Sequence, residues 1–479
     1  MNCQHNSAKC TWAAGIAALF LALLASCGGG VVGSGGTGSP MGAAVGTVNG
    51  FGSVVVDGHA YDNRNAPVLA EVEPGRDIVS EVKLGHRVSV DYATAGVASV
   101  VRVDAALVGA VTSVLSPSQF SVLGQTVTVN ASATTGPVTQ FGGGYAQAAD
   151  LRANDAVEVH GVLIRQGTSY RVQATRIDKL AAAPAYLRVT GLVSQLGTGG
   201  AVTLSLGALT VDASTATLLP AGTALANGQA VTVLALPGTL TALPGGAWRL
   251  QASQVRVREL RSGGLDDYVS GSVTGLDTLT KTFALGSLMV NYAAASVSPA
   301  TPPLANSQYV RVRGMGDAAG VLVATSVTIR DGSTGSEAEL KGNISGYDAV
   351  TKRFVVRGVT VDAIGTTRVE ACPATGLANG LFVEIHGSLG SNGVVAQTIH
   401  CENEPSGSTV EREGNAGAVN ISGMGFSLLP ENGSALSVTW TATTYFGGVT
   451  PQTLSGKKVH VEGSLVGTTL VAPKIKLDA

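Results

Sequence analysis

Residues 383–387, Val-Glu-Ile-His-Gly, carry the pattern that decides the fold, because apolar and polar side chains alternate and the run ends at a glycine. The pattern returns as Val-Glu-Val-His-Gly at 157–161, Val-Arg-Val-Arg-Gly at 310–314 and Val-His-Val-Glu-Gly at 459–463. Alternation with a period of two places Val and Ile on one face of a strand and the polar residues on the other. The chain is therefore expected to consist of repeated, half-buried strands.

Further strands accompany this one in each repeat. The first strand of a repeat opens at a glycine, as in Gly109-Ala110-Val111, and another ends at Asp or Asn, as in Val359-Thr360-Val361-Asp362. Short strands with one apolar face would leave both sheet edges exposed, so each repeat is expected to close on itself. The predicted fold class is all-β: tandem small β-barrel-like repeat domains of five to six short strands each, every barrel with its own core.

Glycine-rich or proline-containing stretches separate most of the repeats, for example Ala181-Ala182-Ala183-Pro184. The stretch near Asp104 has almost no linker, so the first two repeats are expected to pack tightly. The predicted organisation is a signal at 1–26, a tether at 27–44, and repeats at 45–105, 106–180, 187–260, 268–331, 339–402 and 414–479, the last one divergent.

The first residues of the chain resemble a bacterial lipoprotein signal. Lys9 supplies a positive start, and the apolar run from Trp12 to Leu24 is shorter than the ~20 residues of a membrane-spanning helix. Leu24-Ala25-Ser26-Cys27 then has the residue pattern of a lipobox. We expect cleavage before Cys27 and acylation of its thiol, with palmitate among the chains, followed by a flexible glycine-rich tether. An ordinary secretory signal with a chance cysteine is the alternative.

Composition excludes several classes of protein. Charged residues make up 13% and aromatic residues 5% of the chain, which contains 64 glycines, so long surface helices and a disordered chain are both disfavoured. Loss of residues 1–26 removes Lys9 and changes the formal net charge from −2 to −3. A nearly neutral chain has no basic field for nucleic acid, and membrane attachment must come from the lipid.

Two cysteines remain after the signal and Cys27. Cys372 and Cys401 are expected to form a disulfide in an oxidising compartment, with two free thiols as the alternative. A metal site is disfavoured, because two thiols alone do not fill a tetrahedral site.

The repeated pattern behind a lipobox resembles a bacterial exported family catalogued as domain of unknown function 5666. The resemblance rests on the Gly-x-Val openings, the Thr-Val-x-Asp/Asn strand ends and the Val-x-Val-x-Gly strands. It covers about residues 45–330 and 340–402, and 414–479 loosely, where Trp440 stands in place of a strand-end Asp or Asn. The family implies no known reaction, so no catalytic residue is carried over.

Several polar residues are candidates for metal binding or acid–base chemistry. His160 follows Glu158, and His386 follows Glu384, two positions later on the same strand face, but a third metal ligand is not evident. His400 and Cys401 are adjacent and should face opposite ways. The recurring strand-end residues are expected to cap turns and not to bind calcium: Asn130, Asp212, Asn291 and Asp362. No catalytic residue, metal site or cofactor is predicted.

The expected function is that of a non-catalytic, lipid-anchored cell-envelope protein with a structural or binding role. Glycine follows Cys27, which favours an outer-membrane lipoprotein of a Gram-negative bacterium, on either the periplasmic face or the cell surface. Its expected partners are the membrane, through the lipid, and a protein or glycan of the envelope. Two alternatives remain open: a metal-dependent or hydrolytic enzyme that uses one degenerate repeat, and an assembly or secretion accessory lipoprotein.

Overall fold

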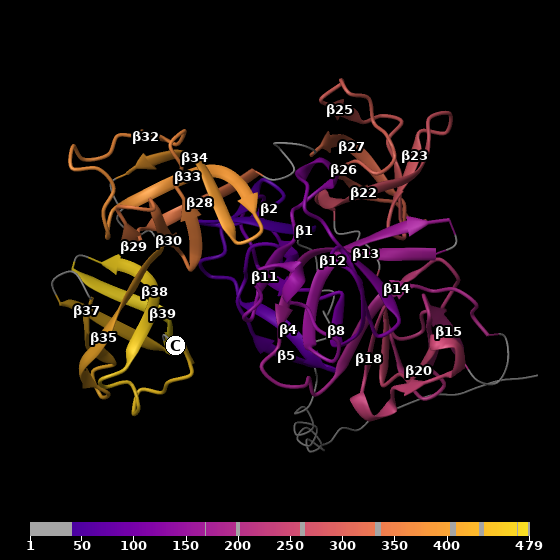
Figure 1. Cartoon of the computed structure of the whole chain (residues 1–479), viewed down its shortest axis with the longest axis horizontal. Coiled ribbons are helices and arrows are strands. Elements are labelled where there is room, and N and C mark those ends of the chain that lie inside the picture. The colour runs from indigo at the N-terminus through magenta and orange to yellow at the C-terminus, as the bar shows by residue number, and fades with distance from the viewer. Residues whose placement is uncertain are drawn as a thin grey trace, which may run out of the picture. The chain divides into compact units, whose positions relative to one another are not determined.

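The computed structural model describes residues 41–477 apart from 168, 198–201, 259–263, 331–336, 403–408, 431–434 and 467. These residues lie in one compact unit, and they fold almost entirely into strands that form six small barrels, numbered here in chain order (Figure 1). The predicted all-β class is confirmed. Within the described residues, no helix has the length and apolar character needed to cross a membrane.

The first three barrels occupy the N-terminal part of the described chain. Barrel 1 contains β1 (Gly42–Phe51), β2 (Val54–Val56), β3 (His59–Tyr61), β4 (Val68–Glu73), β5 (Arg76–Val79), β6 (Arg87–Tyr92) and β7 (Val100–Val103). Barrel 2 contains β8 (Leu107–Ser116), β9 (Gln119–Val122), β10 (Gln125–Val129), β11 (Gln140–Gly142), β12 (Ala156–Gln166) and β13 (Ser169–Lys179). Barrel 3 contains β14 (Leu187–Leu192), β15 (Thr203–Leu206), β16 (Leu209–Asp212), β17 (Thr217–Leu219), β18 (Ala230–Ala235), β19 (Thr241–Ala242), β20 (Trp248–Gln251) and β21 (Gln254–Val257).

The other three barrels follow along the chain. Barrel 4 contains β22 (Asp267–Asp277), β23 (Thr282–Leu285), β24 (Leu288–Asn291), β25 (Ser296–Ser298), β26 (Tyr309–Gly316) and β27 (Leu322–Ile329). Barrel 5 contains β28 (Glu337–Asn343), β29 (Ser345–Asp348), β30 (Arg353–Val356), β31 (Val359–Asp362), β32 (Arg368–Glu370), β33 (Phe382–Gly390) and β34 (Gly393–Cys401). Barrel 6 contains β35 (Thr409–Asn420), β36 (Gly425–Leu429), β37 (Leu436–Gly447), β38 (Lys458–Val466) and β39 (Thr469–Leu477). Short 3-10 turns lie at Ala133–Thr135, Ala148–Asp150, Pro237–Thr239 and Pro244–Gly246.

One strand order recurs in the barrels. In barrel 6 the closed order is β35-β36-β37-β39-β38, and among the described residues of this barrel only β37 and β39 pair in parallel. Barrels 2, 4 and 5 close in the same order. In barrel 1 the isolated bridge Asp62–Val97, and in barrel 3 the bridge Ser194–Ser205, supplies one of the strand-to-strand contacts that close the barrel. This order of five principal strands, with the third parallel to the fifth, is that of the OB-fold, a small Greek-key barrel that hosts many unrelated functions.

The recurring glycine after the alternating strand has a steric cause. The ladder shifts register at this point through a bulge, for example between His160 and Gly161 and between Arg313 and Gly314. A Cβ on Gly314 would lie 2.2 Å from the carbonyl oxygen of Val323 on the neighbouring strand, and one on Gly387 would lie 2.3 Å from that of Val395. Only glycine fits such a close backbone approach. The glycine of the Val-x-Val-x-Gly pattern therefore marks a bulge in the fourth of the five principal strands, such as β12, β26 and β33.

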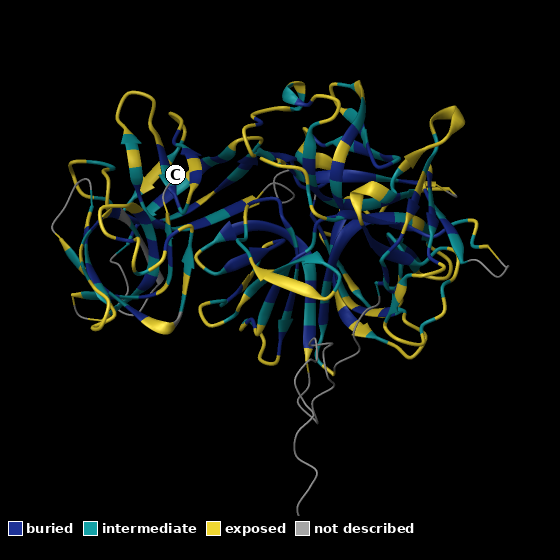
Figure 2. Cartoon of the chain, turned by 90° about the horizontal axis from the view of Figure 1, so that it is seen from below, coloured by how far each residue is buried: buried dark blue, intermediate teal, exposed yellow. Residues whose placement is uncertain are grey.

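The first strands of several barrels also pair with one another. Strand β8 pairs antiparallel with β14, where Val108 faces Arg188, and β1 pairs in parallel with β22 at one end and with β28 at the other. Buried residues run along the strands and exposed ones fill the connecting loops (Figure 2). The buried side chains of barrels 2 and 3 form one continuous cluster, from Ala106 to Val257. The expectation that every barrel has a separate core is therefore wrong for these two barrels, because their first strands share a ladder.

Candidate functional site

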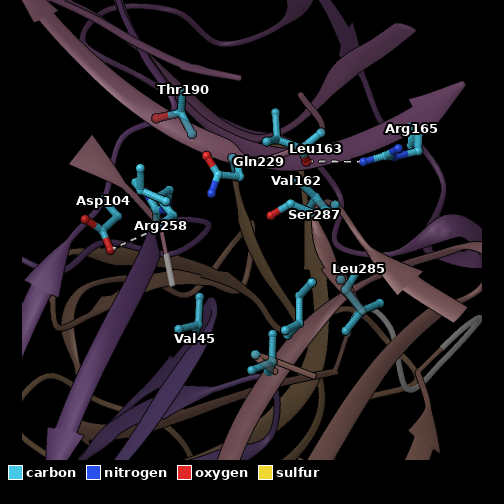
Figure 3. Close-up of a pocket in the computed structure, with 18 of the residues that line it drawn as sticks. Val45, Asp104, Val162, Leu163, Arg165, Thr190, Gln229, Arg258, Leu285 and Ser287 are labelled. Carbon is cyan, nitrogen blue, oxygen red and sulfur yellow. Dashed lines mark hydrogen bonds and ion pairs between the residues drawn. The ribbon is translucent and has the colours of Figure 1, made fainter. Parts of the chain in front are cut away.

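A polar cleft of about 940 Å³ lies where barrels 1 to 4 meet. Barrel 3 contributes Thr190, Gln229 and Arg258, and β12 of barrel 2 contributes a run that ends at Arg165. Figure 3 shows Arg258 with Asp104 on one side of the cleft in this view, and Arg165 on the opposite side. The volume lies within the usual range of pockets for small molecules.

The other walls of the cleft come from barrels 1 and 4. Val45 and Arg87 belong to barrel 1, and the turn that carries Ser287 belongs to barrel 4. The described lining contains no aromatic residue, so it offers no stacking surface for a sugar ring or a base. Apolar side chains, including Val269 and Leu285, form part of the surface. The lining therefore combines an apolar wall with separate cationic groups.

A network of charged side chains connects barrels 1 and 3 and reaches the cleft at Asp104 and Arg258. The Glu71 carboxylate accepts hydrogen bonds from Arg256 at 2.7 and 3.0 Å and lies 3.5 Å from the Arg188 guanidinium. Asp104 lies 3.6 Å from Arg188 and 3.5 Å from Arg258. Burial alone would raise the pKa of Asp104, but the adjacent Arg258 and Arg188 guanidinium groups lower it overall. Asp104 is thus held as a carboxylate that neutralises its arginines.

Next to this network, the structure supplies the third residue that the sequence did not indicate. His86, just before β6, lies with Glu158 and His160 of β12, and their potential ligand atoms are all within 4.8 Å of one another. The Nε2 atom of His160 lies 2.8 Å from Glu158, and the two imidazoles stack with their centroids 4.2 Å apart. No local sequence pattern indicates that His86 meets His160, because the two residues belong to different repeats.

The geometry of this histidine pair suits a hydrogen-bonded contact between barrels 1 and 2 better than a metal site. The backbone N–H groups of Lys83 and Arg87 each donate to an Nδ1 atom, of His86 and His160 respectively, at 3.3 Å. A neutral imidazole whose Nδ1 atom accepts a backbone N–H carries its proton on Nε2, so it has no ring lone pair left for a metal ion. Burial, followed by the charges of His160, Arg176 and Lys83, lowers the pKa of His86 well below its ordinary value. The buried His86 ring thus stacks on His160 where barrel 1 packs against barrel 2.

The second histidine–glutamate pair stands at the surface of barrel 5. The Nε2 atom of His386 lies 3.1 Å from Glu384, which also lies 3.5 Å from Lys341. The His386 side chain is about half exposed, at 49%. Among the described residues, no third possible metal ligand lies close to His386 and Glu384 as His86 does to His160 and Glu158. This pair therefore has the character of a polar surface contact.

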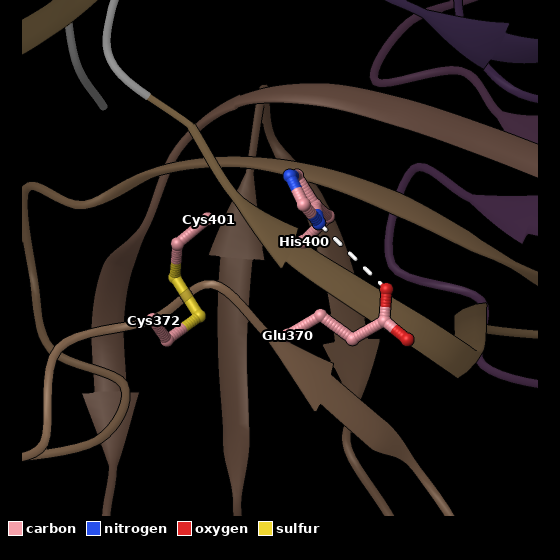
Figure 4. Close-up of a disulfide and its surroundings, with 4 residues drawn as sticks. All are labelled: Glu370, Cys372, His400 and Cys401. Carbon is pink, nitrogen blue, oxygen red and sulfur yellow. Dashed lines mark ion pairs between the residues drawn. A yellow bond between two sulfur atoms is a disulfide. The ribbon is translucent and has the colours of Figure 1, made fainter.

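The other sequence candidates lie in barrel 5 or outside the described residues. Cys372 and Cys401 are joined by a disulfide, and His400 lies beside it with its Nδ1 atom 3.8 Å from Glu370 (Figure 4). Cys401 is buried whereas the His400 side chain is 44% exposed, as expected for neighbours on opposite faces of a strand. The lipobox residues Leu24, Ala25 and Ser26 and the lipidation candidate Cys27 lie outside the described residues.

The expected turn-capping role holds for three of the four strand-end residues. The side-chain Oδ1 atoms of Asn130, Asp212 and Asn291 each accept the backbone N–H two residues later, at 3.0–3.3 Å. Asp362 instead accepts hydrogen bonds from the Arg353 guanidinium on the neighbouring strand. None of the four belongs to a cluster of possible metal ligands among the described residues.

Comparison with solved structures adds two distant likenesses. The silver-bound structure of CusF residues 10–88 from Escherichia coli covers 16% of this chain and 100% of its own, at 13% identity and a TM-score of 0.14. Drosophila Unr CSD456 covers 47% of this chain and 97% of its own, at 14% identity and a TM-score of 0.12. At these TM-scores neither likeness bears on function. No curated protein matches the chain.

The family comparison agrees with the repeat pattern. The model of the domain of unknown function DUF5666 matches residues 108–178, 270–328 and 341–400. These segments coincide with the strands of barrels 2, 4 and 5. The chain therefore contains three tandem segments, in barrels 2, 4 and 5, that match the DUF5666 model.

Proposed function

We propose that this chain is a lipid-anchored protein of the bacterial cell envelope that binds a small ligand, without catalysis, in the cleft between barrels 1 to 4. The cleft carries the proposal, because its walls come from four barrels whose first strands pair across their boundaries. A pocket built on rigid strands keeps its shape in the absence of ligand, which lowers the entropic cost of binding.

The chemistry of the lining favours binding over catalysis. Its two carboxylates are both committed: Asp104 faces two arginines, and Asp317 accepts the backbone N–H groups of Ala319 and Val321 in its own turn. The hydroxyls of Ser270 and Ser287 have no histidine, lysine or glutamate beside them in the described lining. A nucleophile in this setting would lack the general base that activates it.

Occupancy of the cleft tests the binding role. Full-length mature protein purified from the envelope is expected to carry a small molecule in native mass spectrometry. The substitution Ser287→Trp should abolish this occupancy by filling the cleft, whereas Leu279→Trp, at a fully exposed turn of the same barrel (93% exposed), should retain it. Wild-type protein without a bound molecule, or a Ser287→Trp variant that retains it, would contradict the proposal.

The anchor rests on the lipobox and the tether and has its own test. Wild-type protein is expected in the membrane fraction, with an N-terminal peptide that begins at Cys27 and carries acyl chains. The substitution Cys27→Ala should remove the acylated peptide and release the protein from the membrane. The substitution Ser34→Ala in the tether provides a control that leaves the anchor intact. An unmodified N-terminus at another residue would refute the lipid anchor and leave the cleft unaffected.

A further inference from the structure

We propose that the ligand of the cleft is a small organic anion whose carboxylate or phosphate group is bound by Arg165. This inference rests on the proposed binding function and specifies the chemistry of the ligand. The cleft lining holds three arginines, Arg87, Arg165 and Arg258, against the aspartates Asp104 and Asp317. The excess of positive charge favours an anion.

Arg165 is the arginine whose hydrogen-bonding capacity is least used. Its Nη2 atom lies 3.4 Å from the carbonyl oxygen of Gly228, and its Nε atom is buried with no hydrogen-bond partner. No carboxylate forms an ion pair with Arg165 among the described residues. The Arg165 side chain as a whole is only partly buried, and a carboxylate or phosphate that accepts N–H bonds from its Nη groups would supply the counter-charge that it lacks.

The other charges of the cleft do not neutralise Arg165. Asp104 is already shared between Arg188 and Arg258, and the Asp317 side chain caps its own turn. The Arg87 guanidinium donates to neutral groups, the Thr47 hydroxyl at 3.1 Å, the Tyr309 hydroxyl at 3.2 Å and the Ser270 carbonyl at 3.0 Å. An incoming anion therefore meets two arginines, Arg87 and Arg165, that have no carboxylate partner in the described structure.

The size and the apolar part of the cleft distinguish an organic anion from an inorganic ion. A volume of about 940 Å³ far exceeds the space that a single phosphate occupies. Val45, Val269 and Leu285 offer contacts for a carbon skeleton. Gln229 accepts the Ala226 N–H through Oε1 at 2.7 Å, which leaves its amide N–H groups available to a ligand oxygen. The lining thus matches a molecule with one charged end and an uncharged body.

Titration calorimetry on the mature protein tests the proposal with four probes. Glutarate and glycerol 3-phosphate supply the two anionic groups, and 1,5-pentanediol and glycerol are their neutral counterparts. We expect at least one anion to bind, with an affinity that falls as salt is added, and neither neutral probe to bind. Whichever anion binds more tightly identifies the group as a carboxylate or a phosphate.

Variants separate the charge of Arg165 from the shape of the cleft. For the anion that binds, Arg165→Gln should raise the Kd by about tenfold or more, and Arg165→Lys, which keeps the charge but loses the planar fork, should have an intermediate effect. The substitution Arg353→Gln, at an exposed arginine of barrel 5, should change the Kd by less than about twofold.

Two outcomes would overturn the inference in different ways. Binding of the neutral probes as tightly as the anions, or an unchanged Kd in Arg165→Gln, would refute the anionic ligand while leaving a binding cleft in place. Absence of binding by both anions, in a protein that carries another small molecule lost in Ser287→Trp, would have the same meaning. Absence of any bound molecule in the wild type would refute the binding function itself.

Discussion

Replacement of Glu71 by Ala is expected to lower the free energy of unfolding of barrels 1 to 3 by about 3–5 kcal/mol, because it removes a buried carboxylate that pairs with the buried Arg188 and with Arg256. The side chains of Glu71 and Arg188 are only 7% and 6% exposed. Arg256 donates two hydrogen bonds to Glu71, so the substitution also removes the direct contact between β4 and β21. Urea denaturation followed by far-UV circular dichroism measures the loss.

A surface pair in the same barrel provides the matched control. Asp77 accepts a hydrogen bond from Arg102 at 2.7 Å, but both side chains are about one-third exposed. Asp77→Ala should therefore cost about 0–1 kcal/mol. The conservative substitution Glu71→Gln keeps the shape and removes the charge, and most of the loss should remain. Equal effects of Glu71→Ala and Asp77→Ala would contradict the view that this network joins barrels 1 and 3.

Removal of the disulfide by the double substitution Cys372→Ala and Cys401→Ala is expected to destabilise barrel 5 by about 3–4 kcal/mol. The two cysteines are 29 positions apart, and the loss of loop-closure entropy in the unfolded chain has this magnitude for a loop of that length. Unfolding of barrel 5, followed by hydrogen exchange in increasing denaturant, measures the effect.

Reductant supplies the control for the disulfide. Dithiothreitol should lower the stability of barrel 5 in the wild type to nearly that of the double variant, and should leave the double variant unchanged. Labelling of denatured protein with a thiol reagent should modify Cys372 and Cys401 only after reduction. Two reactive thiols in protein purified from the envelope without reductant would contradict an oxidised pair.

Local sequence patterns predict the strands, because the alternation of apolar and polar residues along a strand matches the alternation of its buried and exposed side chains. The alternation in β6 and β33 places Val88, Val90 and Ile385 in the interior, fully buried. The recurring glycine of the fourth strand is visible in the sequence. Its cause is a bulge that brings the glycine against a carbonyl of the neighbouring strand, and this can be recognised only once the register of the two strands is known. In barrel 6, Trp440 departs from the Asp/Asn pattern and is nevertheless buried beside Phe446, so the same strand order persists with a different side chain.

The cleft could not be predicted in the same way, because its residues come from different repeats. Arg165 and Arg258 carry no motif, and nothing in their local sequence indicates that β8 pairs with β14 or that β1 pairs with β22. The pair of Glu158 and His160 was visible on one strand, but His86 is 74 positions from His160 and reaches it only through the packing of barrels 1 and 2. Contacts between repeats depend on surface complementarity that period-two alternation does not encode.

The central claim is that barrels 1 to 4 form one unit whose paired first strands shape the cleft, and amide hydrogen exchange at Thr190 tests it most directly. The Thr190 N–H donates across the boundary of barrels 2 and 3 to the Ala106 carbonyl at 2.7 Å, and its side chain lines the cleft. We expect this amide to exchange as slowly as that of Val193, which donates within barrel 3 to Gln229 at 2.9 Å. Exchange at Thr190 as fast as at the exposed turn around Leu279 would show that barrels 2 and 3 separate in solution and would contradict the account.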